Sequence, residues 1–445
     1  MSGKIPLIPD VGSEGEDFPF EIWLDRRTQK YWVRDAHGVW SQLNDQMLDR
    51  FLRAECIRTI GPKGDNTEAD TLKRRICYSR SVDFGGPIAG YMEGTHMCVG
   101  KRILVTESPK RIEPIEGEYA LISNLIWEVL NRHKEQFHRF LLWLKCSMES
   151  LREGPPFRPG QALFLCGPAG GGKSLLQRLI TVILGGRCGK PYQYMTRATS
   201  FNQDLIGAEH LMIEDEQASA DIRARRNFGA SLKDMVVNDD QRLHAKGKDA
   251  IILRPFWRVT VSTNNEPENL NILPVMDDSI RDKVMIFETG GGLSGAPTHP
   301  AERKVFWDSL VSQIPALLHI LSTYILPPED ADSRYGVAAW HHPQIMEVIS
   351  NAAPEWRLWD LICDACIAGN AAGKWRGTAL ELVRILEEKN PTAVRQLLRN
   401  SQTCGTYLGR LARHPKSQHL VEQHRTASER VWIIRGGKLA DGMTP

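Results

Sequence analysis

Eight consecutive residues of this 445-residue chain have the types and spacing that can hold a phosphate group. They fit the pattern G-x-x-x-x-G-K-[ST], in which glycines let the backbone turn tightly and point its N–H groups at the phosphates. The lysine places a positive charge on the β- and γ-phosphates, and the hydroxyl after it can bind Mg²⁺. We therefore predict a site for ATP and Mg²⁺ made by Gly167, Pro168, Ala169, Gly170, Gly171, Gly172, Lys173 and Ser174.

The segments on either side of this loop have the patterns of a strand and a helix. Residues 162–166 are a short apolar run, which is typical of a buried strand, and residues 174–184 have helical spacing that ends at Gly185 and Gly186. The loop is therefore expected at the N-terminus of a helix, where backbone N–H groups favour an anion. The alternative is a chance glycine-rich turn, which would need neither a strand before it nor a helix after it.

A second cluster brings adjacent acids to the end of an apolar strand. Residues 210–213 form the strand, and Asp215 and Glu216 follow Glu214. We expect Asp215 to hold Mg²⁺ through a water molecule and Glu216 to polarise the water that attacks the γ-phosphate. Glu214 is a competing acid, so these roles could be shifted by one position.

A third candidate is an amide at the end of another strand. Residues 258–263 are rich in β-branched side chains and predict a central strand, which Asn264 and Asn265 follow. We expect Asn264 to hydrogen-bond the attacking water and the γ-phosphate, with Asn265 one residue further out. The alternative is that one of these residues makes an Asx-type turn after the strand.

Arg281 is a candidate for contact with a neighbouring subunit. It precedes the apolar strand of residues 284–287, where a guanidinium can reach a γ-phosphate held by the next subunit. The alternative is a surface salt bridge with Asp278 or Asp282.

A polar hairpin is the candidate DNA contact. Residues 241–253 predict two short strands, and Lys246, Gly247 and Lys248 stand at the tip, close to His244. In a ring of subunits, such tips would line a channel with lysines and histidines that contact the phosphates of a single strand. An ordinary solvated hairpin is the alternative.

The composition is that of a globular protein without a strong charge bias. Hydrophobic residues make up 42% and charged residues 25%, and the net charge is +2, so nucleic-acid contacts must come from local clusters. The nine cysteines form no paired framework, and Cys363 and Cys366 predict packed thiols rather than a metal or redox site. With no signal-peptide pattern and no apolar run of about 18 residues, we expect a cytoplasmic protein without a membrane contact.

Breaks rich in proline and glycine divide the chain. The expected parts are a flexible arm (1–18), an α+β N-terminal domain for assembly or for DNA or partner docking (19–155), an ATPase core (156–290), a helical lid and linker (291–350), a C-terminal domain (351–437) and a tail (438–445). Three helical patterns and a hairpin suit a winged helix in the C-terminal domain. This domain has local positive charge from Arg410, Arg413, Lys416, Arg425 and Arg430. Such charge indicates either nucleic-acid binding or a solvated basic surface on a small interaction domain.

In this order, the five motifs resemble those of the superfamily 3 helicases, an AAA+ group of viruses, phages and plasmids. The chain is most similar to the helicase half of phage and plasmid primase-helicases of the poxvirus type, over roughly residues 85–345. The resemblance implies an α/β AAA+ P-loop core, a hexameric ring and hydrolysis of ATP between subunits, with Arg281 at the position of the arginine finger. Two departures are Glu214-Asp215-Glu216 in place of a lone acidic pair and Arg281-Asp282-Lys283 in place of two adjacent arginines.

The prediction that follows is an ATP-dependent replicative DNA helicase of a phage, plasmid or other mobile element that translocates on single-stranded DNA. We expect no primase domain in this chain, because the residues before the loop show neither zinc-ribbon cysteine spacing nor a convincing Asp-x-Asp pair. A separate primase or polymerase could therefore be a partner. One alternative is an AAA+ initiator or loader that melts DNA without processive unwinding, and another is a DNA-binding switch in which ATP only sets the oligomeric state.

Overall fold

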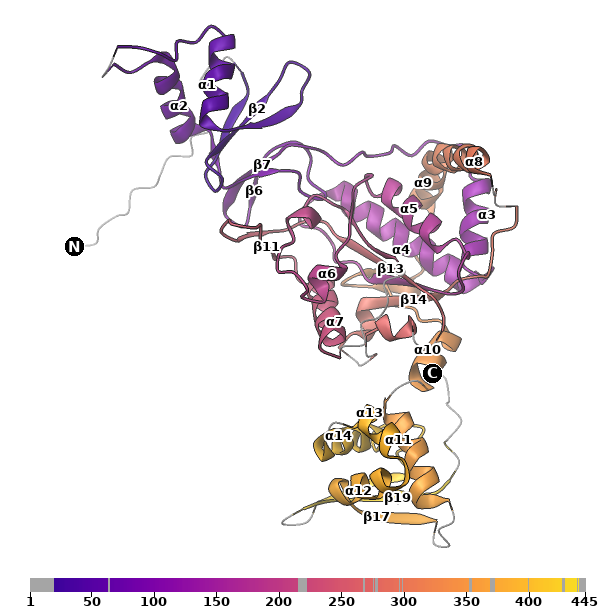
Figure 1. Cartoon of the computed structure of the whole chain (residues 1–445). Helices are drawn as coiled ribbons and strands as arrows, with labels where there is room; N and C mark the ends of the chain where they lie inside the picture. The colour runs from indigo at the N-terminus through magenta and orange to yellow at the C-terminus, as the bar shows by residue number, and fades with distance from the viewer. Residues whose placement is uncertain are drawn as a thin grey trace, which may run out of the picture. The chain divides into compact units, whose positions relative to one another are not determined.

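The computed structural model describes residues 20–437 and residue 439, apart from 63–64, 215–221, 267–268, 275, 277–278, 296, 298, 352–353, 369–372, 399 and 426–428 (Figure 1). The chain divides into two compact units. The first comprises Met1–Asn264 and Asn271–Trp340, and the second comprises Asn265–Leu270 and His341–Pro445.

A five-stranded parallel sheet lies at the centre of the first unit, with the strand order β14-β8-β13-β10-β9. Its strands are β8 (Ala162–Cys166), β9 (Cys188–Gly189), β10 (His210–Glu214), β13 (Arg258–Thr263) and β14 (Val284–Glu288). All residues of β8 and β13 are buried, which explains the unbroken apolar run of β8 and the many β-branched side chains of β13. In the pairing register, Cys166 is opposite both Thr263 and Glu288, so the carboxyl ends of three strands meet at one edge.

One apolar core joins this sheet to five helices. Side chains that alternate along β8 and β14, such as Leu163 and Leu165, pack with residues of all five. The helices are α3 (Ala120–Val129), α4 (Lys134–Glu153), α5 (Lys173–Ile183), α8 (Pro300–Ser312) and α9 (Ile314–Thr323) (Figure 1). Since α5 follows β8 directly, the predicted order of strand, loop and helix is present.

The first residues of this unit form two small sheets and two helices. The first sheet has the strand order β3-β2-β1-β4, and β5, β7 and β6 make the second. Ile22, Leu48, Leu52 and Ile76 lie in the core of the first sheet and its helices. The elements are β1 (Ile22–Asp25), β2 (Lys30–Arg34), β3 (Trp40–Leu43), α1 (Asp45–Ala54), α2 (Glu68–Ser79), β4 (Ser81–Val82), β5 (Phe84–Gly86), β6 (Gly94–Cys98) and β7 (Lys101–Val105).

Further elements complete the first unit. Two of these strands, β11 and β12, pair antiparallel and form the hairpin expected at residues 241–253. The elements are α6 (Tyr192–Met195), η1 (Gln203–Leu205), α7 (Ile222–Val237), β11 (Gln241–Leu243), β12 (Ile251–Leu253), η3 (Arg281–Lys283), η4 (Pro328–Asp330), β15 (Ala331–Asp332) and β16 (Gly336–Val337); a further turn, η2, is Asn269–Ile272.

One stretch of the described chain, Pro300–Thr323, is long and apolar enough by length and composition to cross a membrane. The core helices of many proteins pass the same test, so this is weak evidence. The stretch is made of α8 and α9, and the latter buries Leu317, Leu318 and Leu321 in the core shared with the central sheet.

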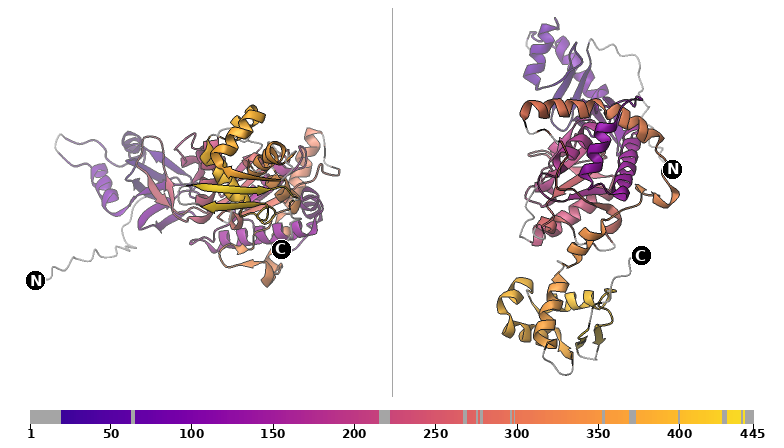
Figure 2. Two further views of the ribbon diagram at one scale, coloured as in Figure 1. Left: turned by 90° about the horizontal axis from the view of Figure 1, so that it is seen from below. Right: turned by 90° about the vertical axis from the view of Figure 1, so that its right-hand side faces the viewer.

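The second unit has a three-stranded antiparallel sheet with the order β17-β19-β18, and Figures 1 and 2 show its helices gathered on one side of this sheet. The last of the three helical patterns in this part of the chain forms two helices, α13 and α14, because the Asn400 side chain accepts a hydrogen bond from Thr403 N and begins a new helix. The elements are α10 (Pro343–Asn351), α11 (Pro354–Ile362), a π-helical turn (Cys363–Ile367), β17 (Lys374–Thr378), α12 (Ala379–Lys389), α13 (Pro391–Leu397), α14 (Ser401–Leu411), β18 (Val421–Arg425) and β19 (Arg430–Arg435).

Candidate nucleotide site

The loop of residues 167–174 lies at the carboxyl edge of the parallel sheet, between β8 and α5. Gly170 and Gly172 have φ values of +77° and +81°, a region that favours glycine. Gly172 is also the N-cap of α5 and has no side chain to bond the first N–H groups of the helix. These donors therefore remain for an anion, and the helix dipole favours negative charge at the same place.

The glycines of this loop also permit close packing against the chain that follows β14. A Cβ atom on Gly167 would lie 2.1 Å from Thr289 Oγ1, and one on Gly171 would lie 2.2 Å from the Gly290 carbonyl oxygen. Thr289 N in turn donates to Cys166 O at 2.7 Å, and Gly290 N donates to Val129 O at 3.0 Å. The sequence indicated only a domain boundary at residue 290, but Thr289 and Gly290 form a wall of the loop.

The Lys173 ammonium is buried, with 6% of the residue exposed, and lies within this loop. Its Nζ donates to the carbonyl oxygens of Gly167 and Pro168 at 2.7 and 2.9 Å, and to Asn264 Oδ1 at 3.1 Å. Asn264 follows β13, the neighbour of β8, so the sheet brings together two candidates that are 91 residues apart in the chain.

The two acids predicted to act on Mg²⁺ and water, Asp215 and Glu216, lie outside the described residues. Glu214, the competing acid, is the last residue of β10 and forms an ion pair with Lys190. In the sheet register, Glu214 is opposite Ser262, two residues before Asn264. The strand that leads to the acids therefore ends beside the strand that leads to the amide.

Arg281 is exposed in η3, directly before β14. Within the described part of the chain it forms no ion pair, and no contact joins it to Lys173 or Asn264. Asp282, one of the two acids considered as its partner, instead binds Lys283 Nζ at 2.6 Å, while Asp278 lies outside the described residues. The structure thus leaves the Arg281 guanidinium at the surface.

A buried polar network connects α5 with β10 and β13. Gln177 Nε2 donates to Thr260 Oγ1 at 2.8 Å and to Ile213 O at 3.2 Å. His210 lies 2.7 Å from both the Thr260 and the Thr181 hydroxyls, one at each ring nitrogen. A neutral imidazole satisfies both contacts, because it donates at one nitrogen and accepts at the other. This network fixes α5, the helix after the phosphate loop, to β10 and β13, the strands that lead to the acids and the amide.

We expect the stability of the protein to depend on His210 below neutral pH. Burial lowers the pKa of His210 to about 3, so the unfolded chain, with a histidine pKa of about 6.5, binds a proton that the native state rejects. The unfolding free energy should therefore fall as the pH is lowered from about 6.5 towards 3, by at most about 1.4 kcal/mol per pH unit from this group. Chemical denaturation of the wild type and of His210→Gln at pH 5 to 7.5 measures how steeply the unfolding free energy of each protein changes with pH. The same pH dependence in both proteins would contradict this prediction.

The hairpin of β11 and β12 is held at its base by a residue that sequence reasoning missed. Asn202 is buried, and its side chain accepts from His244 N at 2.8 Å and donates to Arg242 O at 2.9 Å. Its backbone N–H donates to His244 O at 3.1 Å. At the tip, Gly247 has a φ of +71° and Lys246 is exposed, while Lys248 is half-buried. Asn202 thus sets where the candidate DNA contacts project.

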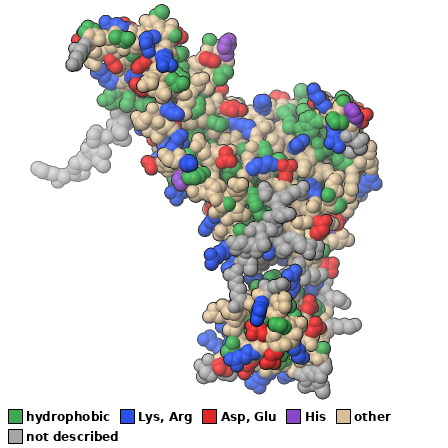
Figure 3. Space-filling model, viewed as in Figure 1, with side chains coloured by type: hydrophobic (Ala, Val, Ile, Leu, Met, Phe, Trp, Pro, Cys, Tyr) green, Lys and Arg blue, Asp and Glu red, His purple; other side chains and the backbone are tan. Residues whose placement is uncertain are grey.

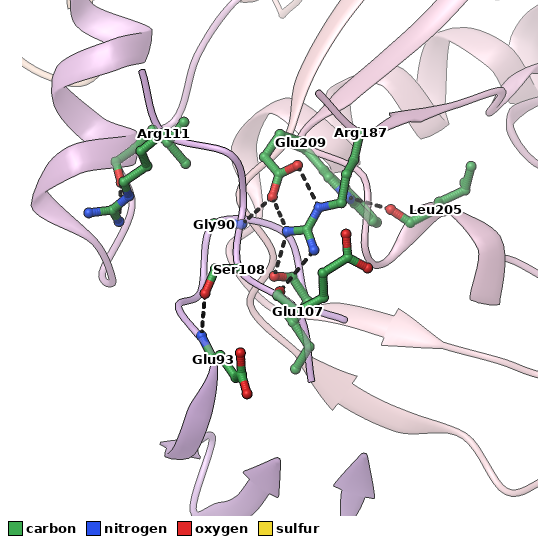
Figure 4. Close-up of polar contacts among 11 residues, drawn as sticks. Gly90, Glu93, Glu107, Ser108, Arg111, Arg187, Leu205 and Glu209 are labelled. Atoms are coloured by element: carbon green, nitrogen blue, oxygen red, sulfur yellow. Dashed lines mark hydrogen bonds and ion pairs between the residues drawn. The ribbon is translucent and has the colours of Figure 1, made fainter. Parts of the chain in front are cut away.

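A buried ion pair secures the segment of β5 to β7 against the central sheet. Figure 4 shows the Glu209 carboxylate, which is fully buried, between the Gly90 backbone and Arg187. Gly90 N donates to Glu209 Oε1 at 2.8 Å, and Arg187 Nη1 donates to Glu107 O at 2.9 Å. Gly90 has a φ of +83°, and a Cβ there would lie 2.6 Å both from the Phe157 ring and from Phe256 Cβ. This close packing and the positive φ explain why position 90 is a glycine.

The chain is therefore a mixed α/β protein in which a parallel sheet presents a phosphate-loop pattern, a buried lysine and an amide at one edge. Residues 165–281 match a protein-family model whose description is a family of unknown function (DUF5906). No curated protein matches the chain.

Solved structures match over nearly the whole chain. The apo structure of the NrS-1 C-terminal region has a TM-score of 0.57 and 14% identity, covering 94% of this chain and 96% of that one. A second structure of that region, the A form, gives 0.55 and 13%, with 94% and 97% covered. At this identity the likeness shows the fold alone. A structure of JCV helicase gives a TM-score of only 0.28 at 13% identity, with 52% of this chain and 60% of that one covered.

Proposed function

We propose that this chain is an ATP-hydrolysing DNA helicase of the superfamily 3 type, which acts in the replication of a phage, plasmid or other mobile element. The observation that carries the proposal is the contact of Lys173 Nζ with Asn264 Oδ1 inside a glycine loop. In this proposal, residues 156–290 are an AAA+ P-loop core, residues 291–350 a lid, and residues 351–437 a winged-helix-like domain.

The residues present fit ATP and Mg²⁺. A buried ammonium and the uncapped start of α5 suit a triphosphate, while the Ser174 hydroxyl and the Asp215 carboxylate are the oxygen donors that would hold Mg²⁺. When bound, Mg²⁺ neutralises charge on the β- and γ-oxygens. Lys173 stabilises the negative charge that develops as the γ-phosphate leaves.

Two further groups act on water and on the product. Glu216 orients and deprotonates the attacking water, and Asn264 hydrogen-bonds that water and the γ-phosphate. Because Asn264 already bonds Lys173, loss of the γ-phosphate changes the partners of both side chains together. Arg281, exposed at the surface, supplies its charge to the site of the next subunit of a hexameric ring.

The hairpin tips contact single-stranded DNA in the channel of that ring. Lys246 and Lys248 are placed by the short turn at Gly247, and His244 lies beside Phe201 with ring centroids 5.1 Å apart. Lysines suit the phosphates of a strand of any sequence. Movement of the hairpin with the state of the nucleotide site would then pull the strand.

We expect the double substitution Lys246→Ala with Lys248→Ala to uncouple ATP hydrolysis from DNA. The basal ATPase rate should stay within about twofold of the wild type, because neither lysine belongs to the nucleotide site, whereas stimulation by single-stranded DNA should fall about tenfold or more. Arg303→Ala with Lys304→Ala, an exposed pair on α8, is the matched control. Unchanged stimulation and unwinding would place the DNA contact elsewhere.

The first test of the function is the ATPase rate with and without single-stranded DNA at two salt concentrations. Strong stimulation that fades with salt is expected for a motor that tracks phosphates, and unwinding of a forked duplex should accompany it. A substantial ATPase rate that single-stranded DNA does not change would favour the alternative of an initiator or loader. A negligible rate under all conditions would favour an ATP-dependent switch.

A further inference from the structure

A buried glutamine, which the proposed function does not use, holds the end of strand β14. Gln136 lies in the first turn of α4 and is 0% exposed. Its Nε2 donates to Leu130 O at 2.9 Å and to Glu288 O at 3.1 Å, and its Oε1 accepts from Glu288 N at 2.6 Å. All the polar atoms of this amide are therefore engaged. On the face of the molecule drawn in Figure 3, by contrast, basic and acidic side chains are interspersed, so no charge of one sign marks a further site there.

The position of β14 in the sheet shows what this glutamine does. β14 is the last strand in the sheet order, and its strand neighbour is β8. On the other edge of β14, Ile286 N donates to Trp340 O at 3.0 Å, and two residues further on the Gln136 amide bonds both the N–H and the C=O of Glu288. The side chain thus takes the place of a neighbouring strand at the last residue of β14.

The two residues after Glu288 form the wall of the phosphate loop. Thr289 is buried, and its N–H donates to Cys166 O at 2.7 Å. Its hydroxyl has no hydrogen-bond partner among the described residues, so it contributes shape to the wall. Cβ atoms on Gly167 and Gly171 would lie only 2.1 and 2.2 Å from atoms of this wall. Because loop and wall are in such close contact, a shift of Glu288 would be passed on to the loop.

Gln136 also restrains the turn between α3 and α4. Asn131 and Arg132 in this turn have φ values of +53° and +54°, which residues other than glycine keep only where their surroundings enforce them. The bond from Gln136 to Leu130 O is one such restraint, and Asn131 Nδ2 donates to Glu288 Oε2 at 2.9 Å. The turn and the end of β14 are therefore held together, with the Gln136 amide between them.

We propose that Gln136 is a positioning residue of the nucleotide site. Through Glu288, it holds Thr289 and Gly290 against the phosphate loop and keeps that loop in the shape that binds the phosphates of ATP. This inference rests on the proposed function, because it takes ATP as the ligand of the loop. It assigns part of the nucleotide affinity to a side chain on α4, outside the motif.

The rate of the chemical step should depend little on Gln136. Lys173 and Asn264 come from α5 and from the end of β13, and none of the described hydrogen bonds joins them to Gln136. A displaced wall would therefore weaken the binding of ATP in the ground state and in the transition state alike. Such a uniform loss of binding raises KM and leaves kcat nearly unchanged.

The test compares the full wild-type chain with Gln136→Met, whose side chain has a similar size but makes none of these hydrogen bonds. Well below the melting temperatures, the Kd of a fluorescent ATP analogue with Mg²⁺ and the KM for ATP should both rise about tenfold or more, because small misplacements in a site have effects of this size. The kcat at saturating ATP should stay within about threefold of the wild type. Gln136→Glu, which keeps the shape but as a carboxylate donates neither bond, should behave in the same way.

Gln161→Met is the matched control. Gln161 is also a buried glutamine, with 1% of the residue exposed, and its Nε2 donates to a backbone oxygen, Val337 O, at 2.6 Å. It directly precedes Ala162, the first residue of β8, and so lies at the end of that strand opposite to the phosphate loop. Loss of its bond should lower the melting temperature and leave Kd and KM unchanged. This control separates a general loss of stability from an effect on the loop.

Hydrogen exchange in the wild type decides the case in which the Gln136 variants do not fold. If the wall favours ATP binding, ATP must stabilise the wall in return. The amides of Glu288 and Gly290, which donate to Gln136 Oε1 and to Val129 O, should therefore exchange more slowly when ATP is bound. Unchanged exchange at both amides would overturn the inference.

Other results would also overturn it. An unchanged Kd in folded Gln136→Met, or an equal rise in Gln161→Met, would show that Gln136 has only a structural role. A lower kcat with an unchanged KM would place its effect on the chemical step instead. A wild type that does not bind ATP would overturn the proposed function together with this inference, whereas the first three results leave the proposed function intact.

Discussion

Lys173→Ala is expected to lower the ATP turnover of this protein by about 100-fold or more while the fold is kept. The Lys173 ammonium is buried at the carboxyl edge of the sheet and is the cation that meets Asn264 within the loop. Removal of a preorganised donor from such a site costs about 10²–10³ in rate, because the charge that develops in the transition state loses its partner. The measurement is the steady-state ATPase rate at saturating ATP and Mg²⁺.

The control for this variant is Lys101→Ala, which removes an exposed lysine on β7. Its rate and its melting temperature should equal those of the wild type. Lys173→Ala should also keep a native circular dichroism spectrum, because the three acceptors that it releases lie at a loop partly open to water. A normal ATPase rate in Lys173→Ala would refute the assignment of the nucleotide site.

Arg281→Ala and Glu216→Ala should each be inactive alone and should recover turnover when their subunits are mixed. In a mixed ring, an Arg281→Ala subunit supplies an intact Glu216, and its neighbour supplies the arginine. With random mixing, about a quarter of the interfaces would be complete, while an arginine finger is worth about 10³–10⁵ in rate. The recovered rate should therefore exceed that of either variant by more than tenfold, measured on subunits dissociated and reassembled together.

Two controls make this result specific. Reassembly of each variant with itself should recover nothing, and Lys304→Ala, an exposed lysine on α8, should be active without mixing. Oligomers shown to contain both variants but without recovered turnover would indicate that Arg281 does not act on a neighbouring subunit. An active Arg281→Ala protein would make this arginine an ordinary surface residue.

The elements that the sequence predicted best were those whose pattern reports burial directly. The strand of residues 162–166 is β8 to the residue, because a parallel strand covered on both faces is an unbroken apolar run. The hairpin at Lys246 was also expected, since a polar turn with glycine separates two short strands. By contrast, β17 has a charged and glycine-containing sequence without alternation, and was not expected.

The contacts that complete the candidate site could not be predicted in the same way. Asn202 bonds the hairpin across about forty residues of chain, and no local pattern marks an asparagine that does so. His210 looked like an ordinary strand residue, and only the positions of α5 and β13 around it make its neutral imidazole necessary. Thr289 and Gly290 follow a strand at a break in composition, which hid their contact with the phosphate loop. Tertiary packing decides all three.

Strand β14 connects Arg281 to the wall of the phosphate loop within one subunit. Arg281 lies just before its first residue, Val284, and Thr289, against which Gly167 packs, directly follows its last residue, Glu288. Five strand residues span roughly 17 Å at about 3.3 Å each, and hydrogen bonds to β8 stiffen them along their length. A force on Arg281 from the phosphate of one subunit would therefore reach the loop that holds the phosphate of the next. Through β14, the conformation of the phosphate loop in each subunit of the ring would depend on whether its neighbour has hydrolysed ATP.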